Sequence, residues 1–341
     1  MNFRLYPLPP FFSPRKAGKI WRVPYEQRAK QARAWASRHK IKPTHQDDFK
    51  INLFLVDLQN TFCIPGGELY VGGRSGLGAV EDIQRLCAFI YRNLGNITHI
   101  SLTMDTHKTI QVFHSIFLID DKGNHPQPHT LVSTLDISSG RWRFNPHIGP
   151  AIGFTAQQGQ DYLAYYVQQL EKKGKYQLTI WPYHAMLGGV GHALVPLLEE
   201  AVFFHSIARS SQPDFELKGS SALTEKYSVI KAEVERDASG KVLSETNQKL
   251  IDDIGRYEMT IIAGEAKSHC LGNTVNDLLE ALTKTNPDLI GRIHLLEDAT
   301  SPVVVPGVLD YTDQADALFR RFEQAGMHIV RTTTPISKEM K

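Results

Sequence analysis

Short apolar runs that alternate with longer amphipathic stretches are the feature that most limits how this sequence can fold. Six runs rich in β-branched and apolar residues are typical of buried parallel strands, and they cover 51–56, 97–104, 176–181, 201–205, 259–263 and 292–296. Helical patterns lie between them, over 79–93, 160–172, 193–201, 274–283 and 310–325. Strands that alternate with helices predict a three-layer α/β/α protein with a mostly parallel, doubly wound sheet.

Length and composition indicate one large globular domain. The chain has 341 residues, of which 42% are apolar and 22% are charged, and these are ordinary values for a soluble protein. We expect a basic N-terminal extension over 1–48 and a single domain over 49–341. Residues 118–158, punctuated by Gly, Pro, Asn and Asp, and the charged stretch 232–252 are predicted to be insertions near the active edge of the sheet.

The sequence predicts neither a membrane segment nor a signal peptide. No apolar run reaches the roughly 18 residues that span a bilayer, and the N-terminal stretch lacks a long apolar region. The three cysteines form an odd and sparse set, which argues against a disulfide framework and for a reducing compartment. We therefore expect a cytoplasmic protein.

Basic residues gather near the N-terminus. Residues 1–40 carry ten Lys or Arg and one acidic residue, Glu26, so this segment has a charge of +9 and the remainder of a chain with net charge +2 has −7. A basic arm could bind nucleic acid or acidic lipid, but no repeat of aromatic and basic residues accompanies this one. We expect the arm to pack on its own domain or on a neighbouring subunit of a homo-oligomer, without a membrane or nucleic-acid partner.

Cys270 is the candidate nucleophile. It follows a predicted buried strand and a turn at Gly264, and it precedes a predicted helix. The start of a helix presents free N–H groups and a partial positive charge. Both lower the pKa of a thiol and can stabilise an oxyanion.

Other polar residues follow the predicted strands, and the carboxyl ends of parallel strands are where such sheets bind ligands. Asp57 could act as a general base, because burial raises the pKa of a carboxyl group, or it could only cap the next turn. One carboxylate and three imidazoles form a ligand set that suits Zn²⁺, Fe²⁺ or Mn²⁺, namely Asp105, His107, His114 and His184. With fourteen histidines in the chain, any single one is more commonly a surface or core residue, and an isolated lysine such as Lys218 is commonly a solvated charge.

Taken in order along the chain, these residues resemble the nicotinamidase and isochorismatase-like cysteine hydrolase superfamily. The resemblance covers about 50–300. Its motifs are D-x-Q-x-x-F, D-x-H with a later His, W-P-x-H, Lys-Gly with a later Tyr-Ser, and a glycine-to-cysteine loop, matched by Asp57, Gln59, Phe62, Asp105, His107, His114, Ser115, Phe117, Trp181, Pro182, His184, Lys218, Gly219, Tyr227, Ser228, Gly264, Cys270 and Thr274.

The resemblance implies an amidohydrolase that converts nicotinamide and water to nicotinate and ammonia through a thioester. It implies a catalytic triad of Asp57, Lys218 and Cys270. It also implies an oxyanion hole formed by the amides of Ala266 and Cys270, and a cis peptide between Glu265 and Ala266.

The resemblance further implies a divalent metal, zinc with iron or manganese as alternatives, that holds the ring nitrogen of a small amide substrate. The implied ligands are Asp105, His107, His114 and His184. The implied aromatic substrate pocket is formed by Phe62, Trp181 and Tyr227.

Several positions depart from the family pattern and keep other functions open. Thr106 stands where Trp is usual, Ala185 where Cys is usual, Gly189 where Thr is common, and His269 where Tyr is frequent. One alternative is a related hydrolase that acts on another amide, a ureido or carbamoyl compound, or isochorismate. A second alternative, from another class, is a binding protein without activity that uses its basic arm.

Overall fold

A six-stranded parallel sheet forms the centre of the computed structural model, which describes residues 3–174, 176–337 and 340. Residues 1 and 2, at the start of the predicted N-terminal extension, lie outside the described residues, as does residue 341 at the end of the predicted domain. Neighbouring strands are all parallel, in the order β12 (His328–Val330), β9 (Ile293–Leu296), β8 (Met259–Gly264), β1 (Ile51–Val56), β2 (His99–Asp105) and β7 (Asp214–Lys218).

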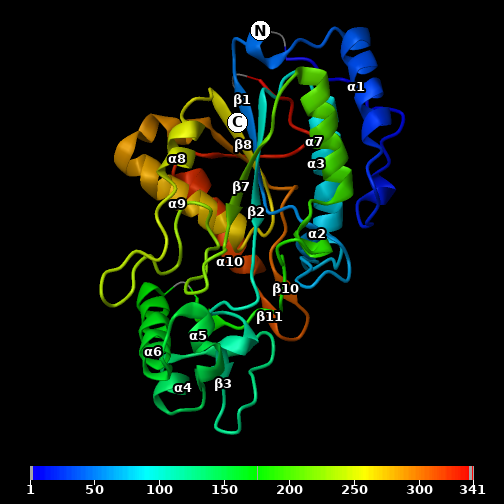
Figure 1. Ribbon diagram of the computed structural model, residues 1–341. Helices are drawn as coiled ribbons and strands as arrows, with labels where there is room; N and C mark the ends of the chain where they lie inside the picture. The colour runs from blue at the N-terminus through cyan, green and yellow to red at the C-terminus, as the bar shows by residue number, and fades with distance from the viewer. Residues whose placement is uncertain (1–2, 175, 338–339, 341) are drawn as a thin grey trace.

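Helices cover both faces of the sheet (Figure 1). On one face lie α1 (Tyr25–His39), α3 (Gly78–Arg92) and α7 (Pro196–Arg209). On the other lie α8 (Gln248–Ile254), α9 (Cys270–Thr285) and α10 (Thr312–Gln324). The predicted three-layer, doubly wound α/β fold is confirmed.

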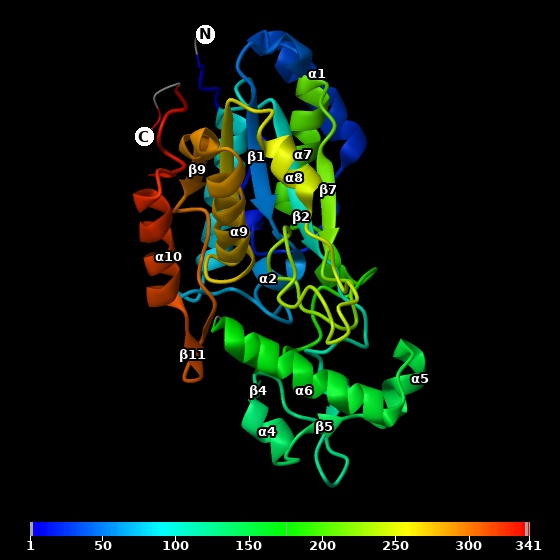
Figure 2. The ribbon, with the colours of Figure 1, turned by 90° about the vertical axis from the view of Figure 1, so that its left-hand side faces the viewer.

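A smaller lobe lies beyond the carboxyl ends of the central strands (Figure 2). It contains α4 (Thr134–Ser138), α5 (Gly149–Ile152), α6 (Ala156–Lys173), and the antiparallel pairs β3 (Leu118–Ile119) with β5 (Arg143–Phe144) and β4 (Leu131–Val132) with β6 (Leu178–Thr179). The remaining elements are α2 (Asn60–Cys63), a hairpin of β10 (Val304–Val305) and β11 (Leu309–Asp310), and 3-10 turns at Pro14–Lys16, Thr44–Gln46, Ser115–Phe117, Pro146–Ile148, Val190–His192 and Pro287–Arg292.

Strand β1 shows why the sheet needs two layers of helices. All six of its residues are buried, and successive side chains of a strand point to opposite faces of the sheet. Leu53 and Leu55 pack into one hydrophobic cluster, whereas Phe54 and Val56 pack into the other. A strand that is buried at every position is therefore covered on both faces.

Two predicted strands are wrong. Residues 201–205 lie inside α7, because a short apolar run cannot be distinguished by its pattern from a buried segment of helix. Of 176–181, only Leu178 and Thr179 form a strand, and they pair antiparallel with β4, outside the six-stranded sheet. The sequence analysis also missed β7 and β12, which are the two edge strands of the sheet.

The N-terminal arm packs on its own domain through α1, which lies against α7. Arg28 Nε lies 2.5 Å from Glu200 Oε1 in a buried ion pair, and the Arg28 guanidinium lies 3.9 Å from the ring centre of Phe11. Part of the basic charge is therefore used inside the protein. Among the described residues, the helices include none with the length and apolar character that a bilayer crossing requires.

Candidate active site

The carboxyl ends of four adjacent strands bring the candidate residues together (Figure 2). Asp57 follows β1, Asp105 ends β2, Lys218 ends β7, and Cys270 begins α9 after β8. The register of β2 and β7 pairs Asp105 directly with Lys218. The site therefore follows from the order of the strands, although the residues are far apart in sequence.

The nucleophile loop, residues 264–270, passes close to the end of β1. Gly264 has φ of +131°, and a Cβ at this position would lie 2.1 Å from the carbonyl oxygen of Val56, so only glycine fits. The peptide between Glu265 and Ala266 is cis, as predicted. Among the described residues, the amides of Ala266 and Cys270 donate to no protein acceptor, which leaves both free to bind a ligand oxygen.

Lys218 is the centre of the buried polar cluster. Its Nζ lies 2.8 Å from Asp57 Oδ2, 3.0 Å from Asp105 Oδ1 and 3.6 Å from Cys270 Sγ. Thr103 orients Asp57, because its hydroxyl donates to Asp57 Oδ1 at 2.5 Å and accepts from the Asp57 amide at 3.1 Å. The structure thus places Asp57, Lys218 and Cys270 in mutual contact range.

Burial dominates the protonation of this cluster. Burial raises the pKa of the Cys270 thiol well above its ordinary value, although the Lys218 ammonium acts in the opposite direction. Burial also raises the pKa of Asp57 against the effect of Lys218. The pKa of Lys218 is raised, because the carboxylates of Asp105 and Asp57 more than offset burial. The expectation of a low thiol pKa at the helix start is wrong for the resting protein, whose thiol is protonated.

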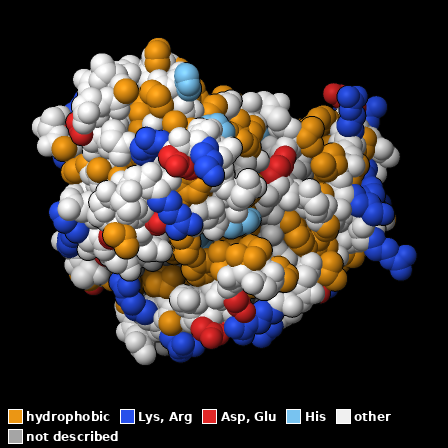
Figure 3. All heavy atoms as spheres, turned by 90° about the horizontal axis from the view of Figure 1, so that it is seen from below, with side chains coloured by type: hydrophobic (Ala, Val, Ile, Leu, Met, Phe, Trp, Pro, Cys, Tyr) orange, Lys and Arg blue, Asp and Glu red, His pale blue; other side chains and the backbone are white. Residues whose placement is uncertain are grey.

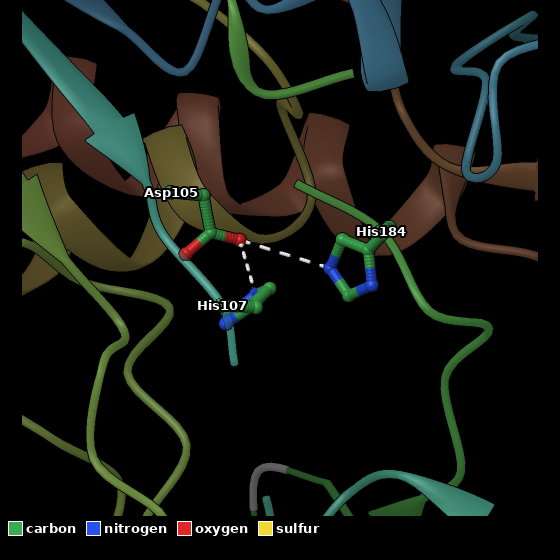
Figure 4. Close-up of side chains that lie close together, drawn as sticks. All are labelled: Asp105, His107 and His184. Atoms are coloured by element: carbon green, nitrogen blue, oxygen red, sulfur yellow. Dashed lines mark hydrogen bonds and ion pairs between the residues drawn. The ribbon is translucent and has the colours of Figure 1, made fainter. Parts of the chain in front are cut away.

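Three of the four predicted metal ligands converge (Figure 4). One ligand atom each from Asp105, His107 and His184 lies within 4.8 Å of the others. Asp105 Oδ2 lies 2.8 Å from His107 Nε2 and 3.7 Å from His184 Nε2. Burial alone would raise the pKa of Asp105, but His107 and Lys218 lower it well below its ordinary value, so the carboxylate is charged.

Backbone carbonyls orient the imidazoles in a way that fits a metal. His107 Nδ1 lies 3.1 Å from the carbonyl oxygen of Gly219, and His184 Nδ1 lies 2.7 Å from the carbonyl oxygen of Pro182. An Nδ1–H that donates to a carbonyl leaves Nε2 with a free lone pair, which is the usual second-shell arrangement of metal-binding histidines. A Cβ on Gly219 would lie 2.6 Å from Asp105 Oδ1, so glycine is required beside this cluster.

His114, the fourth predicted ligand, lies beside the cluster and outside the converged group. Its ring centre is 6.0 Å from that of His107 and 6.4 Å from that of His184. Its Nδ1 contacts Thr109 O at 3.1 Å, whereas its buried Nε2 has no partner among the described residues. Burial lowers the pKa of His114 to about 3, so the ring is neutral and can act as a ligand.

His184 reaches the site from a loop that pairs with the segment after β2, rather than from a strand of the sheet. Bridges join Trp181 to His114 and Met186 to His107, and the His107 amide donates to Ala185 O at 3.0 Å. The predicted strand before His184 was wrong, but these backbone contacts bring the histidine to the same place.

A cavity with about 490 Å³ of empty space, part of which is open to solvent, borders both Cys270 and the predicted metal ligands. The predicted pocket residues Phe62, Trp181 and Tyr227 line it together with Ala266 and Cys270. The metal-site residues Asp105, His107 and His184 line the same cavity. Seen from below, where the strands end, hydrophobic side chains gather in several patches on the protein surface (Figure 3).

Glu225 is a cavity residue that the sequence analysis missed. The Trp181 indole donates to Glu225 Oε1 at 2.7 Å and lies 2.9 Å from the hydroxyl of Tyr227. Burial raises the pKa of Glu225 to about 8. Its position two residues before Tyr227 was the available signal, but a single glutamate in a polar segment does not stand out from solvated charges.

Comparisons with known proteins show the fold. No protein-family model matches the sequence, and no curated protein matches it. A structure of yeast nicotinamidase bound to the inhibitor nicotinaldehyde is similar at a TM-score of 0.50 and 16% identity, over 82% of this chain and 99% of that chain. A nicotinamidase and pyrazinamidase from Acinetobacter baumannii gives 0.48 and 17%, over 84% and 99%. A zinc complex of the Pyrococcus horikoshii pyrazinamidase gives 0.43 and 15%, over 83% and 99%.

Proposed function

We propose that this protein is a cysteine-nucleophile amidohydrolase that converts nicotinamide and water to nicotinate and ammonia. The observation that carries the proposal is the contact of Lys218 with Asp57 and Cys270 beside a cavity that also holds Asp105, His107 and His184. The likeness in fold to the yeast nicotinamidase supports the same substrate class.

The proton and the nucleophile move within the buried cluster. Asp57 accepts the thiol proton of Cys270 as the sulfur attacks the amide carbonyl carbon. The oxyanion forms next to the free amides of Ala266 and Cys270. Asp57 then returns the proton to the leaving nitrogen, and ammonia departs as the carbonyl re-forms to give a thioester. Water, deprotonated by Asp57, attacks the thioester carbon and releases the acid and the thiol.

The cavity orients the substrate. Phe62, Trp181 and Tyr227 offer apolar and aromatic surfaces to a flat ring. Asp105, His107 and His184, with His114 alongside, would hold a divalent cation such as zinc. When bound, this cation would supply a Lewis-acid contact for the ring nitrogen and so fix the ring.

A second candidate is hydrolysis of a different small amide, such as a carbamoyl or ureido compound. Glu225 favours it, because a buried carboxyl group in the cavity wall is a strong hydrogen-bonding group for a polar substituent that nicotinamide lacks. The binding-protein alternative is weakened by the arm, which packs on its own domain through α1.

The test is ammonia release from nicotinamide, pyrazinamide and carbamoyl amides by metal-loaded protein, with and without a chelator. We expect turnover of nicotinamide that is lost in Cys270→Ala and retained in Cys87→Ala, a matched change of another buried free cysteine. Mass spectrometry of the quenched reaction should detect the acyl group on Cys270. Turnover of a carbamoyl amide alone would select the second candidate, and no acylation by any of these compounds would reject both.

A further inference from the structure

A pair of buried carboxyl groups connects the nucleophile loop to α3. Neither belongs to the triad or the metal ligands, although Glu265 lines the same cavity. Glu265 belongs to the loop and Asp82 to α3, and their exposed fractions are 1% and 2%. Ser301 contacts both carboxyl groups, and a hydrogen bond between the two lowers the pKa of Asp82 and raises that of Glu265. We call Asp82 and Glu265 the carboxyl pair.

Ser301 links the carboxyl pair to the loop at three points. Its amide donates to Glu265 Oε2 at 3.1 Å, and its hydroxyl donates to Asp82 Oδ2 at 2.5 Å. Its carbonyl accepts from the amide of Lys267 at 2.8 Å. The first half of the nucleophile loop is thus tied to α3 through one serine and two carboxyl groups.

The hydrogen bonds require a proton within the carboxyl pair. Arg85 is the cation paired with Asp82, at 2.8 Å, so two carboxylates would leave a buried excess of negative charge. As a carboxylate, Glu265 would also leave its buried Oε1 without a donor among the described residues. Asp82 already accepts from Ser301 and Arg85. The proton therefore belongs on Glu265, whose carboxyl O–H donates to Asp82. Burial raises the pKa of Glu265 well above its ordinary value, and Asp82 raises it further.

Few other titratable groups face the carboxyl pair. Cys63 and Tyr70 both have a pKa raised by burial, so both are neutral at neutral pH. Glu81 lies 3.8 Å from Arg85 and is half-buried. The charge in this region is therefore decided by Asp82, Glu265 and Arg85.

We propose that Glu265 is a positioning residue, which holds the nucleophile loop in its catalytic shape by donating a hydrogen bond from its protonated carboxyl group to Asp82. Its effect on catalysis rests on the proposed function, because it acts through the amides of Ala266 and Cys270 in the same loop. Loss of the proton would place two anions in contact and drive the loop away from α3.

Two substitutions separate the hydrogen bond from simple packing. Glu265→Gln keeps one donor for Asp82 and one acceptor for the Ser301 amide, whereas Glu265→Leu keeps a similar volume and removes both. We expect Glu265→Leu to lower kcat about 100-fold, the scale of a lost oxyanion donor, with KM nearly unchanged. Glu265→Gln should rescue most of this loss. Equal loss of kcat in both variants would overturn the proposal.

Two further measurements do not depend on substrate. In the infrared difference between wild type and Glu265→Gln at pH 7, we expect the C=O band of a protonated carboxylic acid. In urea unfolding, the wild type should lose stability relative to Glu265→Gln as the pH rises from about 5 to 8, by up to tenfold in the unfolding constant per pH unit, because a retained proton is released on unfolding.

Absence of both signals would show that Glu265 is ionised and would overturn the proposal even in an active enzyme. If both signals appear but wild type hydrolyses no amide, the proposed function fails and the protonated carboxyl pair stands.

Discussion

Lys218 is the residue whose removal should disturb the molecule most, and the variant Lys218→Met tests the arrangement of the site. The ammonium sits 2.8 Å from Asp57 Oδ2 and 3.0 Å from Asp105 Oδ1, and all three residues are buried. Methionine fills a similar volume without charge. The variant therefore leaves two carboxylates together without their shared cation.

The size of the effect follows from these distances. At an effective dielectric constant of about 20, the two attractions amount to roughly 6 and roughly 5.5 kcal/mol before desolvation is counted. Breaking a buried ion pair by removing one partner costs about 3–5 kcal/mol. Asp57, whose pKa is already raised by burial, takes up a proton more readily without Lys218. The stability that Lys218→Met loses should be smaller at pH 5 than at pH 8. A carboxyl group whose pKa is raised in the folded protein destabilises that protein as the pH rises through the raised pKa.

Urea denaturation of wild type and Lys218→Met at pH 5 and pH 8 measures the effect. The control is Lys30→Met on the exposed side of α1, where the described residues include no ion-pair partner for the lysine. We expect a deficit of about 3–5 kcal/mol at pH 8 and slower alkylation of Cys270, because Lys218 lowers the thiol pKa. A deficit that matches the control, or one that does not change with pH, would refute the electrostatic role of Lys218.

Three further changes test other parts of the structure. The double variant Asp105→Ala and His107→Ala should bind less than one tenth of the metal of wild type with an unchanged circular dichroism spectrum; full metal content would contradict the ligand assignment. Arg28→Met should lower the free energy of unfolding by about 3–5 kcal/mol, because Glu200 stays buried without its partner; an unchanged urea midpoint would count against this ion pair. Because its pKa is raised, Glu225 should make the wild type lose about 1.4 kcal/mol of unfolding free energy per pH unit as the pH rises from 4.5 to about 8. Glu225→Gln should not show this loss. If the unfolding free energies of wild type and variant change in parallel with pH, the pKa of Glu225 is not raised.

The fold was predictable because most positions of the central strands β1, β8 and β9 are apolar. Strands β1, β8 and β9 are wholly buried, and a continuous apolar run is the pattern that such strands require. The edge strand β7 is different, because Phe215 and Leu217 are 49% and 58% exposed. Its pattern is that of a half-solvated segment, and it was missed for that reason.

The missing strand explains why Lys218 had no physical signal in the sequence. A lysine after a buried strand would have been recognised as a site residue, as Asp57 and Asp105 were. Without β7, Lys218 resembled a solvated charge, and its role came from the family resemblance alone. Glu225 lies in the irregular segment between β7 and α8. It was missed because a glutamate in such a segment also resembles a solvated charge.

The charges around Cys270 determine where its proton can go. In the state that is ready to react, the thiol is protonated, Lys218 carries +1, and Asp57 and Asp105 carry −1 each, so these four groups have a charge of −1. Release of the thiol proton to solvent would give −2 in a buried region. Burial is the main reason that the pKa of Cys270 is raised, and the carboxylates of Asp57 and Asp105 raise it further. Transfer of the same proton to Asp57, a carboxylate oxygen of which lies within 4.8 Å of Cys270 Sγ, keeps the charge at −1. Burial therefore makes a free thiolate costly in the resting protein. It favours a thiolate that forms only when the proton passes to Asp57, as the sulfur attacks a carbonyl carbon already in place.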